Sequence, residues 1–273
     1  MKPGIQICII LVSITCSGWA AGERNPAGGR AAGMGGTSVA LIDFWSLSNN
    51  EAGLAWLKTG AAGFSFENRF LLADITTEVV GIAIPLKVGT FGLSVNRYGN
   101  NLYNELKGGL VFARKFGARF GAGLQFNYQR FHLAGEYGNR KIISFQIGLI
   151  YQPDKRISVG VQIINPVPVK ITENPAEYLP ASINLGLTWQ LSDEFLATIE
   201  VGKELQNLPV FRAGAEYHFA KPLFVRIGIS TNPMSFTFGF GIETGKLKFD
   251  FSSGYHQQLG FSPSASVVYT FKR

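Results

Sequence analysis

Charged side chains that could form a buried network occur in consecutive alternating stretches of the C-terminal half. Glu200, Arg212, Glu216, His218 and Arg226 each stand in the polar set of such a stretch. Neighbouring strands bring side chains of this kind within pairing distance of one another. The network could bind a substrate, or it could stiffen a wall and hold an internal segment. We expect the second use.

Catalytic and metal-binding chemistry has little support in the residues. His132, His218 and His256 are scattered and lack the spacing of metal ligands. No Gly-x-Ser-x-Gly elbow is present, and no Ser/His/Asp set can be picked out. Cys8 and Cys16 both fall in a leader-like stretch, so the mature chain would have no thiol for a disulfide or a metal site. We therefore expect a protein that is not an enzyme and needs no cofactor.

The first twenty residues have the pattern of a secretion signal. Lys2 precedes an apolar run at residues 5–14, and small residues at 17–20 allow cleavage after Ala20. A lipoprotein signal at Cys16 is the weaker alternative, because Thr15 fits that motif poorly. No later apolar run reaches the roughly 18 residues of a membrane helix. An exported chain of this kind is either soluble and periplasmic or a barrel of the outer membrane.

Composition favours a protein that meets lipid. Of the 273 residues, 16% are charged and 13% are aromatic, whereas soluble proteins average about a quarter charged residues. The net charge of +7 raises the alternative of nucleic-acid binding. The Lys and Arg residues fall mostly in predicted turns and form no single patch, so we expect no nucleic acid among the partners.

The clearest alternation lies in residues 234–251. Phe236, Phe238, Phe240 and Ile242 share one face, while the residues between them are Thr, Gly, Gly and Glu. Successive side chains of a strand point to opposite faces, so the stretch predicts a hairpin with one apolar and one polar face. A soluble sandwich would show the same alternation with its apolar set turned inward.

The same pattern recurs along most of the chain and predicts fourteen strands, an even number as bacterial barrels require. We expect them at residues 60–69, 77–86, 89–98, 104–114, 119–131, 140–152, 156–164, 180–190, 194–203, 209–219, 222–231, 234–244, 246–255 and 263–272. Connections after even-numbered strands are short, and several of the others are longer, with residues 165–179 the longest. The prediction is an all-β fold: an antiparallel transmembrane β-barrel over residues 59–273.

Closure follows from the lipid environment. Lipid cannot hydrogen-bond an exposed strand edge, so a sheet in a membrane must close on itself. The last predicted strand carries Val267, Tyr269 and Phe271 on one face. A near-terminal aromatic residue on an alternating strand is typical of barrels of the outer membrane.

Residues 21–58 differ from the rest, since they are rich in Gly and Ala and show no sustained alternation. The Gly cluster at residues 28–36 lacks the Lys-Ser/Thr ending of a phosphate loop, and no strand precedes it. A compact segment that packs inside another structure is the better interpretation. A barrel of about fourteen strands would otherwise leave an open interior.

This segment also carries a family resemblance. Residues 29–41 (GRAAGMGGTSVAL), Asp43 and residues 50–54 (NEAGL) resemble the start of FadL-like outer-membrane barrels. The similarity is greatest to the PorV/PorQ branch, which is associated with the type IX secretion system of Bacteroidota, and residues 179–186 (LPASINLG) resemble a mid-barrel strand of that branch. Glu51 stands where the family usually has Pro.

The resemblance implies a fourteen-stranded barrel whose N-terminal segment, residues 21–58, folds into the lumen as a hatch. The expected contacts between the hatch and the lumen wall involve Arg30, Met34, Asn50, Glu200, Arg212, Glu216 and Arg226. Arg30 is expected to pair with a lumen carboxylate, and the sequence leaves Glu200 and Glu216 open.

The functional expectation is a non-enzymatic accessory component of type IX protein secretion that acts by binding other secretion-system proteins. The chain is short for a fatty-acid transporter and its external loops are modest, which favours that role. The alternative is a FadL-like channel for uptake of small hydrophobic molecules, and a structural barrel without transport ranks third. All three place the protein in the outer membrane, in contact with its lipid.

Overall fold

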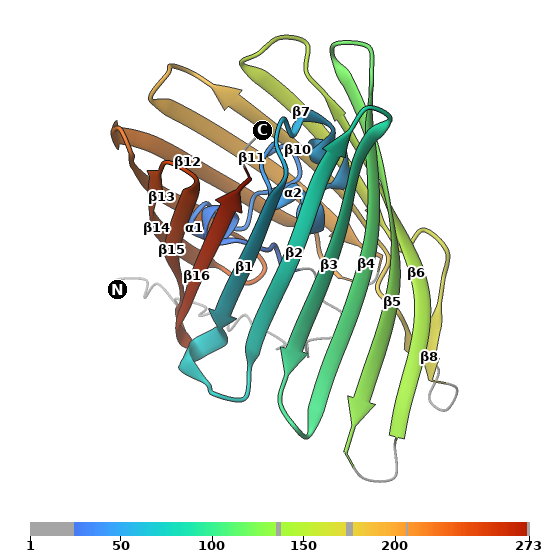
Figure 1. The fold of residues 1–273 in the computed structure, drawn as a ribbon. Coiled ribbons are helices and arrows are strands. Elements are labelled where there is room, and N and C mark those ends of the chain that lie inside the picture. The colour runs from blue at the N-terminus through green and yellow to red at the C-terminus, as the bar shows by residue number, and fades with distance from the viewer. Residues whose placement is uncertain (1–24, 135–137, 173–176, 206, 272–273) are drawn as a thin grey trace, which may run out of the picture.

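The computed structural model describes residues 25–134, 138–172, 177–205 and 207–271. The predicted signal peptide, residues 1–20, lies outside this part of the chain. The described residues form a closed barrel of fourteen strands with antiparallel neighbours (Figure 1). Within the same residues, no helix is both long and apolar enough to cross a membrane.

Every predicted strand is present, with ends that differ by a few residues. The barrel strands are β1 (Ala61–Asn68), β2 (Thr76–Leu86), β3 (Gly89–Gly99), β4 (Tyr103–Phe116), β5 (Phe120–Leu133), β6 (Gly138–Tyr151), β7 (Ile157–Ile164), β10 (Ser182–Gln190), β11 (Phe195–Glu204), β12 (Val210–Ala220), β13 (Leu223–Ser230), β14 (Ser235–Thr244), β15 (Leu247–His256) and β16 (Gly260–Thr270).

The first and last strands close the barrel. β1 pairs antiparallel with β16, from Ala61 opposite Thr270 to Glu67 opposite Ser264. On its other edge β1 pairs with β2, so both of its backbone edges are used. Closure leaves no strand at a free end of the sheet, as a sheet surrounded by lipid requires.

Side chains alternate between the outer surface and the interior as the sequence predicts. Large apolar side chains face outward, among them Val80, Phe126 and Phe238, each about half exposed. Buried polar side chains such as Gln125 and Gln162 face inward. An apolar outer surface around an interior with many polar side chains is the arrangement of a barrel that spans a membrane.

The two ends of the barrel differ. At one end, called here the turn end, short connections follow β2, β4, β6, β10, β12 and β14; the opposite end is the loop end. β4, β5 and β6 each contain 14 residues, whereas β7 contains 8. β7 pairs only with Gln146–Tyr151 of β6, so the remainder of β6 extends beyond it at the loop end.

The connection predicted as one long loop at residues 165–179 contains two short strands, β8 (Lys170–Thr172) and β9 (Glu177–Tyr178). Leu179 is buried against Phe131 and Ile142, which point inward from the extended parts of β5 and β6. The described part of this connection therefore contains regular structure, and it covers apolar side chains that the long strands would otherwise expose.

The N-terminal segment, residues 25–57, lies inside the ring of strands (Figure 1). It contains α1 (Gly29–Gly33), α2 (Ser46–Asn49) and the 3-10 helix η1 (Glu51–Trp56), and a further 3-10 helix, η2 (Arg69–Leu71), follows β1. Gly35 and Gly36 adopt φ angles of 70° and 79° after α1, a conformation that glycine tolerates best. The apolar side chains of the N-terminal segment pack on inward-facing residues of the wall in one buried cluster. This cluster includes Phe44, Trp45, Leu47 and Leu54 of the segment and Val79, Ala83, Val111 and Val268 of the wall.

Candidate functional site

The candidate site is the seam between the N-terminal segment and the wall formed by β11 to β16. Arg30, on α1, donates hydrogen bonds from Nε and Nη2 to the two carboxylate oxygens of Glu216, at 2.9 and 2.7 Å. Its Nη1 donates to Asp43 at 3.1 Å. Of the two carboxylates that the sequence left open, Glu216 is therefore the one that Arg30 contacts. The paired geometry is the strongest form of the Arg–carboxylate interaction.

Glu216 also joins Arg30 to a second arginine. Arg226 Nε donates to Glu216 Oε2 at 2.6 Å, and Arg226 Nη1 lies 2.7 Å from Asp250 Oδ1. The side chains of Glu216, Arg226 and Asp250 are at most 2% exposed. Asp43, Arg30, Glu216, Arg226 and Asp250 thus form one chain of alternating charge, called here the ionic chain.

A glycine makes room for this arrangement. Arg226 lies on β13 and Asp250 on β15, and Gly241 of β14 stands between them. A Cβ atom at Gly241 would lie 2.7 Å from Asp250 Oδ1 and 2.9 Å from Arg226 Nη1. The ion pair can cross β14 because position 241 has no side chain.

The charge of Arg30 depends on its partners. Burial by itself would lower the pKa of Arg30, but Glu216 and Asp43 raise it on balance. Taking a charge out of water is costly unless an opposite charge and hydrogen bonds replace the solvent. The ionic chain therefore stabilises the buried position of α1 only while each member keeps its partner.

Glu200 forms a second anchor. Its Oε2 accepts hydrogen bonds from the backbone N–H groups of Ser38 and Val39, at 2.8 and 2.9 Å. Its Oε1 accepts from Arg212 Nη1 at 3.2 Å. Glu200 thus binds the backbone of the N-terminal segment and not Arg30.

Met34 and Asn50 reach other parts of the wall. Met34 is fully buried, and a Cβ atom at Gly214 would lie 2.5 Å from the Met34 Cβ. Asn50 Nδ2 donates to the Val39 carbonyl at 2.6 Å and lies 3.3 Å from the carbonyl oxygens of Leu149 and Val161. The sequence-predicted residues thus all lie where the segment meets the wall, in separate groups and not in one pocket.

Several contacts at the seam were absent from the prediction. Thr237 Oγ1 accepts from Gly35 N–H at 2.7 Å and donates to the Gly33 carbonyl at 3.0 Å. Ser266 accepts from Gly29 N–H at 3.0 Å, and the two carboxylates Asp43 and Asp250 belong to the ionic chain. The sequence does contain a signal for Asp250, because it is a charged residue on the polar face of the strand predicted at residues 246–255. The serine and threonine contacts give no such signal.

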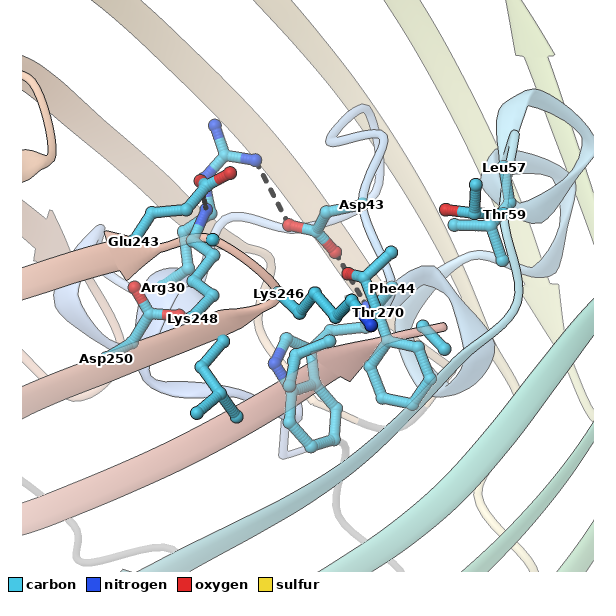
Figure 2. A pocket seen from close by; sticks show the side chains of 15 residues that line it. Arg30, Asp43, Phe44, Leu57, Thr59, Glu243, Lys246, Lys248, Asp250 and Thr270 are labelled. Atoms are coloured by element: carbon cyan, nitrogen blue, oxygen red, sulfur yellow. Dashed lines mark hydrogen bonds and ion pairs between the residues drawn. The ribbon is translucent and has the colours of Figure 1, made fainter. Parts of the chain in front are cut away.

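A small cleft opens beside the ionic chain at the turn end (Figure 2). Its volume is about 150 Å³. Apolar lining comes from Phe44, Trp45, Leu57, Ala61, Leu247 and Val268, and charged lining from Arg30, Asp43, Glu243, Lys246, Lys248 and Asp250. The apolar side chains offer a contact surface to a small hydrophobic molecule, and the charged side chains surround that surface. Within the described residues, no group of three or more His, Cys, Asp and Glu side chains could hold a metal ion.

Comparison with known proteins identifies the fold. The chain matches the monoaromatic hydrocarbon channel CymD with a TM-score of 0.73 and 14% identity, over 91% of this chain and 98% of the other. It matches the toluene transporter TodX of Pseudomonas putida (TM-score 0.68, 12% identity, 91% and 98% covered). A FadL homologue of Pseudomonas aeruginosa matches with a TM-score of 0.66 and 13% identity, over 89% and 98%.

No protein-family model and no curated protein sequence matches the chain. At these levels of sequence identity, the structural matches establish only the fold, which this chain shares with the three solved barrels. The protein has the closed fourteen-stranded fold of FadL-type outer-membrane barrels.

Proposed function

We propose that the protein is a FadL-like channel of the outer membrane that admits small hydrophobic molecules, with residues 21–58 as its hatch. The observation that carries this proposal is the cleft of mixed apolar and charged lining between the N-terminal segment and the barrel wall. The proposal is also supported by the fold, which the chain shares with a monoaromatic hydrocarbon channel and a toluene transporter. We place the barrel in the outer membrane with its turn end facing the periplasm and its loop end facing the exterior.

In this proposal each group of contacts has a role. The ionic chain and Glu200 hold the first part of the hatch against β11 to β15 and keep water-filled paths closed. Phe44 and Trp45 form the apolar floor on which a hydrophobic molecule would rest before release at the turn end. Lys246 and Lys248, on the hairpin of β14 and β15, line the exit.

Filling the cleft tests the channel. Val268 faces the cleft, whereas Val267, its neighbour on β16, is in the outward-facing set. Val268→Trp should reduce uptake of radiolabelled toluene severalfold in cells whose other hydrocarbon channels are deleted. Val267→Trp, the matched control on the lipid face, should leave uptake unchanged. Equal uptake by the Val268 variant and the unmodified protein at equal surface expression would rule out the cleft as the route.

Removing the hatch tests its role separately. A protein that lacks residues 24–57 but keeps its leader should still assemble, because β1 to β16 close the ring without it. The barrel interior would then be open, since about fourteen strands enclose more space than their side chains fill. We expect ion conductance in planar bilayers from the deletion variant and little from the full chain. A deletion variant that is as impermeable to ions as the full chain would refute the hatch.

The second candidate is an accessory role in type IX secretion, which rests on the resemblance of residues 29–54 to the PorV/PorQ branch. Two of the solved structures that match this chain are a hydrocarbon channel and a toluene transporter, which supports the first proposal. Affinity purification from native membranes separates the two. Stoichiometric recovery of a large outer-membrane partner, together with no uptake of toluene, would favour the secretion role.

A further inference from the structure

The lipid-facing surface of the barrel carries few charges, and they are unevenly placed. Along the described barrel strands, alternation and register assign the outward-facing positions. The charged residues at these positions are Glu78, Arg97, Arg114, Arg130, Lys141 and Lys203. Arg114 lies near the turn end and Lys203 stands alone on β11. The others gather at the loop end of β2 to β6.

Strand register places three of these cations in one row. Arg97 on β3 is opposite Leu106 on β4, Leu106 is opposite Arg130 on β5, and Arg130 is opposite Lys141 on β6. Neighbouring strands are about 4.8 Å apart, so the row spans about 14 Å. The three basic side chains are exposed. We call Arg97, Arg130 and Lys141 the basic row.

The positive charges of the basic row are only partly neutralised by neighbouring carboxylates. Glu78 lies 3.6 Å from Arg97 and partly neutralises it. Among the residues that the structure describes, neither Arg130 nor Lys141 forms an ion pair. Like charges directly opposite each other on neighbouring strands repel. An anion bound between Arg130 and Lys141 would remove that repulsion.

The surface directly below the row is apolar. Two residues toward the turn end, the same strands present Val95, Gly108, Tyr128 and Ile143. Val95, Tyr128 and Ile143 are 50%, 49% and 73% exposed. In a membrane such side chains contact acyl chains, while Arg and Lys immediately above them extend into the headgroup layer. The row and the band beneath it therefore match a molecule that has an anionic head and several acyl chains.

We propose that the basic row binds the phosphate groups of a phosphorylated glycolipid in the external leaflet, of the lipid A type. This inference rests on the proposed outer-membrane location and is independent of what the channel carries. Arg offers a planar pair of donors that fits phosphate oxygens, and Lys adds a compact charge. The site lies on the outer wall, away from the hatch and the cleft. Lipid binding would therefore anchor the side of the barrel formed by the long strands β4 to β6 without closing the lumen.

The test uses the full chain in neutral detergent, titrated with diphosphoryl lipid A. The probe for the acyl chains alone is the same lipid with both phosphates removed, and inorganic phosphate serves as a competitor. Arg130→Gln with Lys141→Gln should weaken binding at least about tenfold, because two charge-assisted contacts are lost. The dephosphorylated lipid should bind the unmodified protein as weakly as the variant binds lipid A. Inorganic phosphate should not displace lipid A.

The matched control is Arg114→Gln with Lys203→Gln, which removes the same two side-chain types from outward positions elsewhere. Its affinity should remain within about twofold of the unmodified protein, since an isolated exposed charge contributes little. The single variants Arg130→Gln and Lys141→Gln provide the measurement if the double variant does not fold, as judged by heat-dependent gel migration. Each should weaken binding by a smaller factor.

Three results would overturn the inference. The basic-row and control variants could bind lipid A equally well, or the unmodified protein could bind the dephosphorylated lipid as tightly as lipid A. Displacement of lipid A by inorganic phosphate would show a site for anions in general and not for the lipid. Val268→Trp should bind lipid A normally. A failure of the channel proposal would therefore leave this result unaffected, and the reverse also holds.

Discussion

The two parts of the N-terminal segment both pack closely on glycines of the wall, but they differ in their charged contacts. In residues 25–45, α1 contacts β13 to β16, and the buried carboxylates Glu216 on β12 and Glu200 on β11 bind Arg30 and the backbone of Ser38 and Val39. Residues 46–57, which include α2 and η1, contact β3 to β6. There the segment packs on wall glycines, and the Asn50 amide donates hydrogen bonds to two wall carbonyls.

The glycine side shows how close the approach is. A Cβ atom at Gly81 or Gly92 would lie 2.2 or 2.3 Å from Leu47 side-chain atoms, and one at Gly121 would lie 2.3 Å from Trp56. At Gly123 it would lie 2.5 Å from the backbone of Glu51. Such packing needs the absence of a side chain on the wall and no particular partner group.

The difference suggests how the segment could move. Water can solvate the charged groups of Arg30, Glu216 and Glu200 once residues 25–45 separate from the wall, which lowers the cost of that separation. We therefore expect residues 25–45 to be the part that can leave the wall and residues 46–57 to be the part that stays docked.

The largest effect is expected from breaking the ionic chain at its centre. Glu216→Gln leaves the buried guanidinium groups of Arg30 and Arg226 without their shared carboxylate. Removal of one partner of a buried ion pair costs about 3–5 kcal/mol. Urea unfolding in phospholipid vesicles should show this loss, and conductance should rise if residues 25–45 detach.

The control for that variant is Glu243→Gln. The Glu243 side chain is 53% exposed, with Lys248 at 4.0 Å, and exposed pairs contribute about 0–1 kcal/mol. A Glu216 variant as stable as the Glu243 variant would show that the ionic chain does not hold the segment.

An intermediate effect is expected from crowding the glycine side. Gly123→Ala forces η1 away from β5, and overpacking of this kind costs about 1–3 kcal/mol. Gly254→Ala is the control, because the nearest atoms to its Cβ would be 3.7 Å away. Conductance should stay low if residues 25–45 remain bound. High conductance in the Gly123 variant would reverse the assignment of the docked and detachable parts.

The smallest effect is expected at Thr237. Thr237→Val removes the hydroxyl that bonds Gly35 N–H and the Gly33 carbonyl. Both bonds are only partly buried, so water can replace the hydroxyl, and the cost should be about 1 kcal/mol. Thr244→Val, on the exposed outward face of the same strand, should leave stability unchanged. A loss at Thr237 as large as that at Glu216 would show that the polar contacts outweigh the ionic chain.

The sequence predicted the barrel well because alternation is a local property. Side chains of a strand change face at every residue, so residues 234–244 alone show that Phe238 faces outward and Thr237 inward, as the structure confirms. Fourteen such stretches predicted the number of strands, and the charged members of the polar sets indicated the residues that meet the N-terminal segment.

The tertiary structure decided everything that depends on register between strands and on the path of the N-terminal segment. Glu200 and Glu216 are equivalent in the sequence pattern, yet only Glu216 contacts Arg30, because the position of α1 relative to β12 decides the pairing. The same holds for Asp250, which reaches Arg226 across the glycine at position 241. Contacts of this kind join residues far apart in the chain, and no local periodicity specifies the distance between them.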